Sequence, residues 1–373
     1  MEFLLSIMKE LFFSWKDRLR FQGDYVILII TVFLTLISLY AVYSSTGKIV
    51  SHFFHLLLCF FSIFITYRID YKKLSLFAPF FLLIAAALLL FTLFTGSDDN
   101  RGISLFGIEF QTFYLIGFLV IFYIAKFLGS HLNKEEPLSP KSSYTLIFIL
   151  LFFIGGIAVA NISTAIILIA TSLVVLFVGN FKLKYFVILL SIILVGGSVF
   201  IFTGAGRGET FKGRVHYYLT EDNSKGYGDQ IILAKAAIAR SGFKPTGPGQ
   251  GVIKNVLPEK ETDYVYATVF EEIGILLGLI ILLAYFILFT RAWKISNNSE
   301  GAFAKLLAIG IGFWFTCQGL VHIAVNTELL PATGQTLPFI SRGGSSLIFS
   351  GIMIGTLLNI SKYSKKEKGT EQL

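Results

Sequence analysis

Apolar stretches of about 20 residues recur along most of this 373-residue chain, and they constrain its fold more than any other feature. The chain is 55% hydrophobic and only 14% charged, whereas a soluble domain is usually about a quarter charged. The short alternating segments that build a membrane β-barrel are not apparent. The pattern therefore predicts an all-α polytopic membrane protein, folded as a single membrane domain over residues 1–373.

We expect about ten transmembrane helices with a long extracytoplasmic loop, 206–262, between the seventh and the eighth. Residues 1–24 carry Glu2 and Glu10 and end in basic residues, so they are expected to be a cytoplasmic segment lying on the membrane rather than a secretory signal. Residues 360–373 are the expected cytoplasmic tail. The expected spans are 25–44, 49–67, 74–95, 110–129, 144–161, 163–181, 185–205, 263–290, 302–325 and 335–359.

The basic residues set the predicted orientation. If both termini are cytoplasmic, the inside segments hold nineteen Lys and Arg residues, whereas the short outside loops hold only Lys48 and Arg101. Such a bias is the positive-inside rule, and it places both termini in the cytoplasm. Most of the net charge of +8 therefore has a topological cause, and we expect no nucleic-acid partner.

The long loop is the exception, since long translocated loops escape that rule. Loops of this length are uncommon unless they are functional or disordered. The stretch GDQIILAKAAIARSGF has apolar residues at helical spacing, which predicts a short helix on the outer surface. The nine basic residues of the loop are Arg207, Lys212, Arg214, Lys225, Lys235, Arg240, Lys244, Lys254 and Lys260.

Five carboxylates in LPEKETDYVYATVFEE, positions 257–272, lie where this loop meets the eighth expected span. Asp263 is at the junction, where partial desolvation makes a carboxylate a stronger base. Glu271 and Glu272 lie roughly 12 Å deeper along a helix. These two either serve function or pair with a basic residue and hold helices together.

A basic loop above a carboxylate base indicates an anionic lipid-linked substrate. Arg and Lys side chains bind phosphate or pyrophosphate, and the carboxylate activates a hydroxyl group. These residue types alone do not identify the reaction.

Three segments resemble those of one known family. LPEKETDYVYATVFEEIGILLG resembles the "LPE…TDFIF…EE.G..G" signature of the SEDS family, which is the FtsW and RodA type. QIILAKAAIARSGFKPTGPGQG is similar to its "Q…A…GG..G.G.G" segment. NTELLPATGQTLPFISRGGSSLI, positions 326–348, resembles its "tGllP.tG..LPfiSyGGSSl" segment. Together with the span count and the long loop, this resemblance covers most of the chain.

The resemblance implies a peptidoglycan glycosyltransferase that polymerises lipid II at the outer face of the cytoplasmic membrane. It implies a class B penicillin-binding protein, a transpeptidase, as partner, together with other membrane proteins of the divisome or elongasome. The family's essential acid falls on Asp263. ETFKGRVHYYL resembles the corresponding segment of the division branch, and the elongation branch's "LNP…DP" segment is missing.

The leaving pyrophosphate needs positive charge, from basic side chains or from a divalent cation such as Mg or Mn. The candidates among the basic residues are Arg214, Lys254 and Lys260. Ser345 and Ser346 either line a substrate groove or pack against a neighbouring helix. The other candidate substrate-binding residues are Gln230, Glu271 and Glu272, and no metal ligand is assigned.

The first half of the chain departs from the family pattern. Gly102, Tyr114 and Gly117 stand where the family has Trp, Glu and Lys, and Asn161 replaces an Asp. These changes remove charged groups from the central cavity that the family leads us to expect. They leave the outer loop intact.

Two other functions remain open, a lipid II flippase and a non-catalytic scaffold for division proteins. A flippase needs polar groups through the whole bilayer depth, which the missing charges disfavour. His52 and His55 are spaced like a metal pair, but hydrogen bonding between helices is the simpler interpretation. Arg342 requires a partner within its span, either Glu328 or a substrate phosphate.

Overall fold

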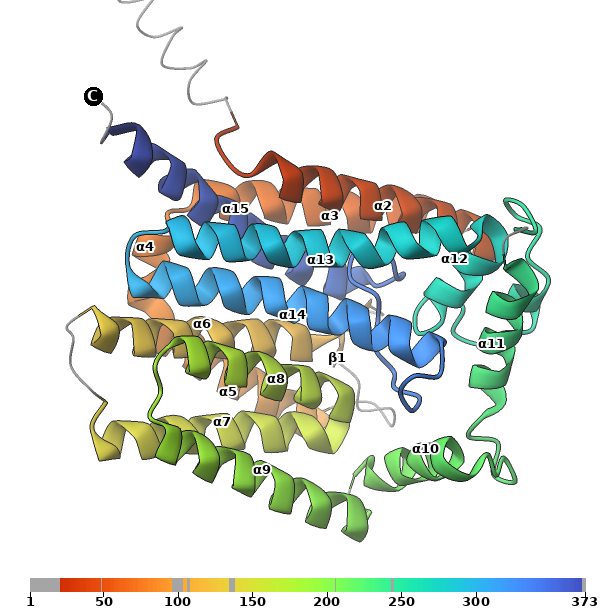
Figure 1. Ribbon diagram of the computed structural model, residues 1–373, viewed down its shortest axis with the longest axis horizontal. Helices are drawn as coiled ribbons and strands as arrows, with labels where there is room; N and C mark the ends of the chain where they lie inside the picture. The colour runs from red at the N-terminus through yellow and green to blue at the C-terminus, as the bar shows by residue number, and fades with distance from the viewer. Residues whose placement is uncertain are drawn as a thin grey trace, which may run out of the picture.

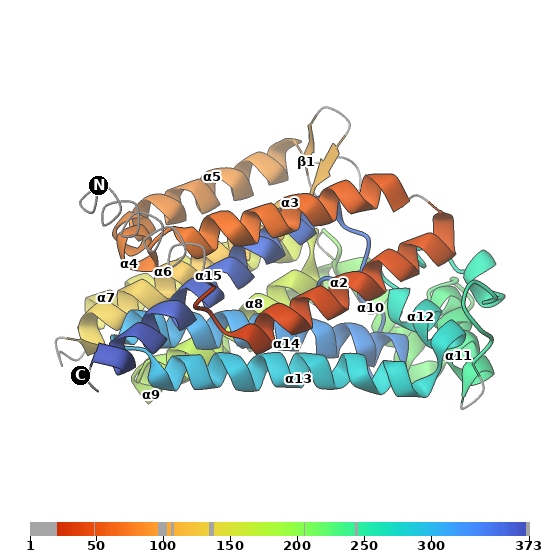
Figure 2. The same ribbon diagram turned by 90° about the horizontal axis from the view of Figure 1, so that it is seen from above.

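A computed structural model of the chain describes residues 21–47, 49–95, 103–105, 108–133, 138–204, 206–242 and 245–370. Over these ranges, long helices run roughly side by side in one bundle (Figures 1 and 2). A helix suits a membrane segment because its backbone amides and carbonyls bond within the segment. The helices of the first half are α2 (Tyr25–Thr46), α3 (Ile49–Arg68), α4 (Tyr71–Leu74), the 3-10 turn η1 (Ser75–Phe77), α5 (Ala78–Thr95), α6 (Thr112–Leu132), α7 (Pro140–Ala160), α8 (Ile162–Val178) and α9 (Leu183–Thr203).

The second half adds short helices at one end of the bundle and three long ones within it. They are α10 (Gly208–Thr220), α11 (Asp229–Ser241), the 3-10 turn η2 (Ile253–Asn255), α12 (Val265–Ile273), α13 (Ile275–Asn298), α14 (Ala302–Asn326) and α15 (Gly344–Thr370). The described part also contains an antiparallel hairpin of β1 (Ile103–Leu105) and β2 (Ile108–Phe110), with Ile103 opposite Phe110.

The expectation of an all-α multi-pass membrane protein is confirmed, apart from that hairpin. Within the described ranges, nine helices are long and apolar enough to cross a membrane, and the 17-residue α8 is a shorter apolar helix. Each of the ten expected spans overlaps one of these helices. The predicted surface segment 1–24 lies outside the described residues up to position 20.

The core of the bundle is formed by α6, α14 and α15. In each of these helices 78% of the most apolar window is buried, against 6% in α9, which lies at the edge of the bundle (Figure 1). Trp314 of α14 and Phe113 of α6 are among the largest fully buried side chains. The central helices therefore pack against protein, whereas α9 presents nearly all of its apolar surface outward.

The long loop is folded and covers one end of the bundle, opposite the C-terminus (Figure 1). The helix expected in GDQIILAKAAIARSGF is present as α11. Sequence reasoning missed α10, whose residues have no strong apolar face. These two helices and the irregular segment 327–343 make up the end at which the candidate site lies.

Two expected spans have the wrong boundaries. The span 263–290 is two helices, because Gly274 adopts φ +89° and interrupts the run between α12 and α13. The span 335–359 begins only at Gly344. Residues 335–343 are irregular, since Pro338 cannot donate a helical hydrogen bond and Phe339 has a left-handed φ of +63°.

Candidate functional site

Asp263 is half-buried at the turn that leads from the long loop into α12. The side chain of Asn326, at the end of α14, fixes the backbone of this turn. Its Nδ2 donates to the carbonyl oxygen of Asp263 at 3.0 Å, and its Oδ1 accepts from the amide of Ala267 at 3.1 Å. The predicted catalytic carboxylate therefore projects from a backbone that α14 holds in place.

The segments 257–264 and 335–343, which carry two of the motifs, are bonded directly to each other. Ser341 Oγ donates to the carbonyl oxygen of Thr262 at 2.6 Å, and the amide of Arg342 donates to the carbonyl oxygen of Glu261 at 2.7 Å. The guanidinium of Arg342 also donates to Glu261 Oε2 at 2.7 Å. Motifs far apart in the sequence thus form one structural unit beside Asp263.

One of the two partners expected for Arg342, Glu328, was predicted wrongly. Glu328 does not pair with Arg342, because it forms an ion pair with Lys235 of α11 instead. Arg342 pairs with Glu261, a residue from the acidic stretch. The fold brings these two side chains together although they are 81 positions apart in the chain, and the sequence does not predict this pairing.

A cavity of about 750 Å³ opens on one side of this unit. It is lined by 257–262, by 342–345, and by Ser51, His55 and Gln111. Lys260 and Ser345 of the predicted substrate-binding set line it, and Ser345 Oγ accepts a hydrogen bond from the amide of Gln111 at 2.7 Å. The cavity is polar and carries charges of both signs.

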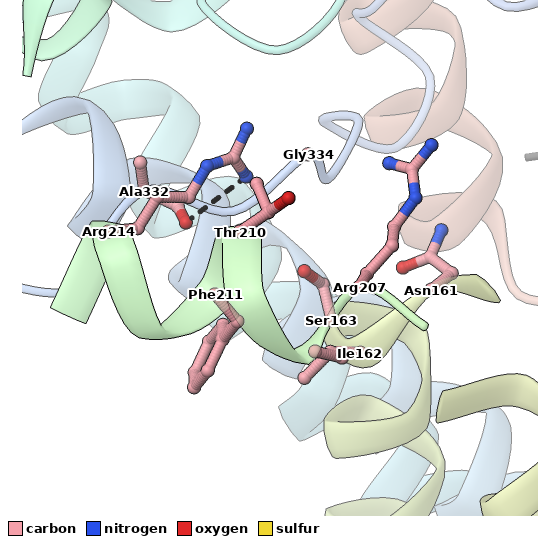
Figure 3. A pocket seen from close by; sticks show the side chains of 9 residues that line it. All are labelled: Asn161, Ile162, Ser163, Arg207, Thr210, Phe211, Arg214, Ala332 and Gly334. Carbon is pink, nitrogen blue, oxygen red and sulfur yellow. Dashed lines mark hydrogen bonds between the residues drawn. The ribbon is translucent and has the colours of Figure 1, made fainter. Parts of the chain in front are cut away.

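A second, smaller pocket of about 40 Å³ lies between α10, the α7–α8 turn and the segment 332–334 (Figure 3). Arg214 of the predicted set lines it and donates to the carbonyl oxygen of Ala332 at 3.4 Å. Arg207 lines it too, although it was not among the predicted substrate-binding residues. The spacing of Arg207, Thr210 and Arg214 on a helix was the signal that could have found this pocket.

Tyr264 connects Asp263 to the smaller pocket. Its side chain packs in one hydrophobic cluster with Ala332 and with Ile231 and Ala234 of α11. Burial raises the pKa of the Tyr264 hydroxyl; the Arg214 charge opposes that rise and the Asp263 charge adds to it. Both charges therefore act on one hydroxyl. Asp263 follows Thr262, which lines the large cavity, and precedes Tyr264, which packs in the cluster of Ala332 at the small pocket.

Lys254 and Glu272 of the predicted set form a buried ion pair. Lys254 Nζ donates to Glu272 Oε1 at 2.5 Å and to the carbonyl oxygens of Ser44 and Gly249, each at 2.9 Å. Glu272 also accepts from the hydroxyl of Tyr40 at 2.5 Å. Lys254 is only 5% exposed, so its ammonium is directed at protein groups.

Glu271 is fully buried, and it accepts from the amides of Val252 at 2.9 Å and Ile253 at 3.1 Å. With Glu272, it holds the loop before the acidic stretch against α12 and α2. This arrangement supports the structural alternative for both glutamates.

Two further predicted substrate-binding residues, like Lys254, Glu271 and Glu272, are not among the residues that line either pocket. Gln230 is half-buried in the first turn of α11. Ser346 is buried at the start of α15, against Gly343. Their roles in binding stay predictions.

Two of the residues that depart from the family pattern, Tyr114 and Gly117, lie in the centre of the bundle. The Tyr114 hydroxyl donates to Gln335 Oε1 at 3.1 Å and lies 2.8 Å from Thr336 Oγ1. The same hydroxyl accepts from Gln318 Nε2 at 3.1 Å. A Cβ at Gly117 would overlap the indole of Trp314. A neutral hydrogen-bonded network and a buried indole therefore occupy this region.

Asn161, the fourth departure, caps a helix. Its Oδ1 accepts from the amide of Thr164 at 3.0 Å at the start of α8. His52 has a structural explanation as well, since the hydroxyl of Ser38 lies 2.7 Å from its Nε2, whereas His55 lines the large cavity. Arg101 and Gly102 lie outside the described residues.

Comparisons with known proteins were made over the whole chain. A family model described as "Cell cycle protein", for FtsW, RodA and SpoVE, matches residues 20–366. A probable peptidoglycan glycosyltransferase FtsW from Trichlorobacter lovleyi is 29% identical over 362 residues, which cover 91% of this chain and 93% of that protein. Stage V sporulation protein E from Bacillus subtilis is also 29% identical over 362 residues, covering 92% and 98%.

Solved structures share the helical bundle. A chain described under "Structural coordination of polymerization and crosslinking by a peptidoglycan synthase complex" aligns with a TM-score of 0.76 at 20% identity, covering 91% of this chain and 98% of that chain. The rod shape determining protein RodA from Thermus thermophilus aligns with a TM-score of 0.66 at 19% identity, covering 91% and 97%. The fold is therefore one that these proteins have in common.

Proposed function

Because this chain belongs to the FtsW, RodA and SpoVE family of cell cycle proteins, we propose that it is a peptidoglycan glycosyltransferase. It polymerises lipid II into glycan strands at the outer face of the cytoplasmic membrane. The observation that carries the proposal is the surroundings of Asp263. Its neighbour Thr262 lines a large polar cavity, and its neighbour Tyr264 packs in one cluster with Ala332, which lines a pocket with two arginines.

Asp263 acts as the general base in this reaction. It takes the proton of the acceptor sugar's 4-hydroxyl, and the resulting oxygen forms a bond to the anomeric carbon of the donor. The bond from that carbon to the lipid pyrophosphate breaks, and its electron pair leaves with the pyrophosphate. Attack opposite the leaving group inverts the anomeric centre.

Cationic side chains stabilise the leaving pyrophosphate. Of the three candidates, Lys254 is buried against Glu272, which leaves Arg214 and Lys260 at the two cavities. Among the described residues, no three or more His, Cys, Asp and Glu side chains are grouped closely enough to hold a metal ion.

A flippase is disfavoured by the centre of the bundle. A transport path for a charged headgroup requires polar groups or water through the bilayer depth. Here Trp314 and the neutral network around Tyr114 are buried between α6 and α14. A non-catalytic scaffold does not require a half-buried carboxylate such as Asp263 next to a residue that lines a large polar cavity.

Several curated relatives are named FtsW, which supports a role in cell division. A class B penicillin-binding protein, a transpeptidase, is the proposed partner, since a solved chain of this fold comes from a peptidoglycan synthase complex that coordinates polymerisation with crosslinking. Other divisome membrane proteins are further proposed partners. Both termini of the chain are proposed to face the cytoplasm.

Glycan synthesis from purified lipid II tests the function directly. The protein and its class B partner are assayed as wild type and as Asp263→Ala, with Asp222→Ala as a matched control, an exposed carboxylate of the same loop that lines neither pocket. We expect polymer from the wild type and from the control, and a loss of roughly 10²–10⁴-fold from Asp263→Ala. Equal polymer from all three removes Asp263 from the mechanism, and no polymer from any of them opposes the polymerase function.

A further inference from the structure

The smaller pocket combines two guanidinium groups with neutral polar groups. Arg214 lies on α10 and Arg207 is the residue that precedes its first turn, so the two are seven residues, or about two helical turns, apart. Figure 3 shows both side chains rising to the same side of α10, toward the segment that carries Gly334. Both guanidinium-bearing side chains therefore line the same small pocket.

The rest of the lining suits an anion. Asn161, Ser163 and Thr210 contribute an amide and two hydroxyl groups. None of the described residues that line this pocket is a carboxylate. The first turn of α8 also lies here, with the positive end of its helix dipole. Every polar side chain in the lining can donate a hydrogen bond to an oxyanion.

The large cavity has a different charge balance. It contains the cations Lys260 and Arg342, but Glu259 and Glu261 line it as well. Arg342 is bonded to Glu261 at 2.7 Å, so the carboxylate offsets that guanidinium. A strongly anionic group is therefore better accommodated in the pocket of α10, and the large cavity suits a neutral sugar.

We propose that the pocket formed by Arg207, Arg214 and the α7–α8 turn binds one phosphate group of a lipid-linked diphosphate. This inference rests on the proposed function and deepens it, because it assigns the leaving group of the donor to a specific pocket. It adds Arg207, Asn161 and Ser163 to the residues that contact substrate.

The size and position of the pocket agree with this assignment. A water molecule needs about 10–15 Å³, so a pocket of about 40 Å³ accommodates a group with the dimensions of one phosphate. Ala332 lines the pocket and packs in the same cluster as Tyr264, the neighbour of Asp263.

A structural role for the arginines is the competing explanation. Arg214 donates to the carbonyl oxygen of Ala332, and that bond alone can hold α10 to the segment 332–334. The 3.4 Å length makes it a long hydrogen bond. A purely structural role predicts lost stability with unchanged ligand affinity, so the test measures both.

The test is binding of farnesyl diphosphate to the full chain in lipid nanodiscs, with farnesol as the uncharged comparator. Arg207→Gln and Arg214→Gln are each expected to weaken diphosphate binding by roughly tenfold or more, because hydrogen bonds between charged groups are lost. Farnesol binding is expected to stay unchanged. Lys212→Gln, an exposed cation of the same helix, is the matched control and is expected to stay within about twofold of wild type.

Lys260→Gln removes the other candidate cation, which lines the large cavity, and it is expected to weaken diphosphate binding less than the Arg207 and Arg214 variants do. The proposal is overturned if the Arg207 and Arg214 variants bind like Lys212→Gln, or if Lys260→Gln alone weakens binding. Thermal unfolding of each variant controls for folding. Arg207→Lys keeps the charge but loses the two-pronged geometry, so it supplies a folded variant with a smaller expected loss.

Lipid II polymerisation by the same variants separates this inference from the proposed function. If the wild type makes polymer and Arg207→Gln has an unchanged KM for lipid II, the pocket assignment fails and the polymerase function stands. If the wild type makes no polymer but diphosphate binding depends on both arginines, the assignment stands and the polymerase function fails.

Discussion

At the scale of single residues, the carboxylates of the acidic stretch divide into two kinds. Asp263 is half-buried at the turn before α12, whereas Glu271 and Glu272 are enclosed and bonded to backbone amides, Lys254 and α2. Carboxylates only eight or nine residues apart in the sequence thus have different surroundings. Burial separates the predicted base from the two enclosed glutamates more clearly than position in the sequence does.

The buried pair of Lys254 and Glu272 supports a prediction about stability. Lys254→Met removes the ammonium and leaves the Glu272 carboxylate buried without its ionic partner, at an expected cost of about 3–5 kcal/mol in free energy of unfolding. Lys260→Met, at a half-buried site on the large cavity, is the control and should cost less than about 1 kcal/mol. Thermal unfolding in detergent measures both. Equal stability of the two variants would show that Lys254 is not a structural residue.

Gly117 supports a second prediction at this scale. A methyl group there overlaps the indole of Trp314, so Gly117→Ala is expected to destabilise the protein by about 1–3 kcal/mol. Gly155→Ala is the matched control, since its Cβ meets no atom within 4 Å. A lower melting temperature for Gly117→Ala than for Gly155→Ala is the expected result. Equal melting temperatures would mean that Trp314 can move aside at little cost.

At the scale of elements, the break between α12 and α13 separates the site from the membrane span. Gly274 adopts φ +89° and ψ −178°, a region that is almost exclusive to glycine. Gly274→Ala is expected to cost about 1–3 kcal/mol and to reduce glycan synthesis, because Asp263 lies at the turn that leads into α12. Gly197→Ala in α9, where the added Cβ meets no atom within 4 Å, is the control. Unchanged activity and stability of the Gly274 variant would show that the break is not required.

The elements also show what the sequence can and cannot predict. Apolar runs indicated every long helix, because a membrane segment of that length has few alternatives to a helix. The break at Gly274 was not predictable from the run itself, since one glycine is tolerated within a helix. The segment 335–343 was predicted as helix because it is apolar, but the backbone amide of Arg342 donates to the carbonyl oxygen of Glu261, and the side chain of Ser341 donates to that of Thr262.

The site was predictable to the same extent. Asp263 stood out because a carboxylate beside an apolar run is costly without a function. The pairing of Arg342 with Glu261 and the burial of Lys254 depend on contacts between distant segments, which neither spacing nor charge reveals. Arg207 was counted among the basic residues of the loop, but only the fold of α10 sets it beside Arg214.

At the scale of the whole molecule, the two ends of the bundle differ. One end holds α10, α11, both cavities and Asp263, and the other holds the C-terminus and the α13–α14 connection (Figure 1). The predicted orientation places the first end outside the cell, because the connections at the second end carry the excess of Lys and Arg in short loops. Polymerisation at the outer face requires this orientation.

Cysteine labelling tests the orientation. Single cysteines are introduced as Lys225→Cys, between α10 and α11, and as Glu300→Cys, between α13 and α14, both at exposed positions. Cys59→Ala and Cys317→Ala provide the background. A membrane-impermeant maleimide is expected to label Lys225→Cys in intact cells and Glu300→Cys only after lysis. The reverse pattern would place Asp263 on the cytoplasmic side, where strand synthesis at the outer face is not available to it, and the proposed function would then fail at the level of topology even if its residues were correct.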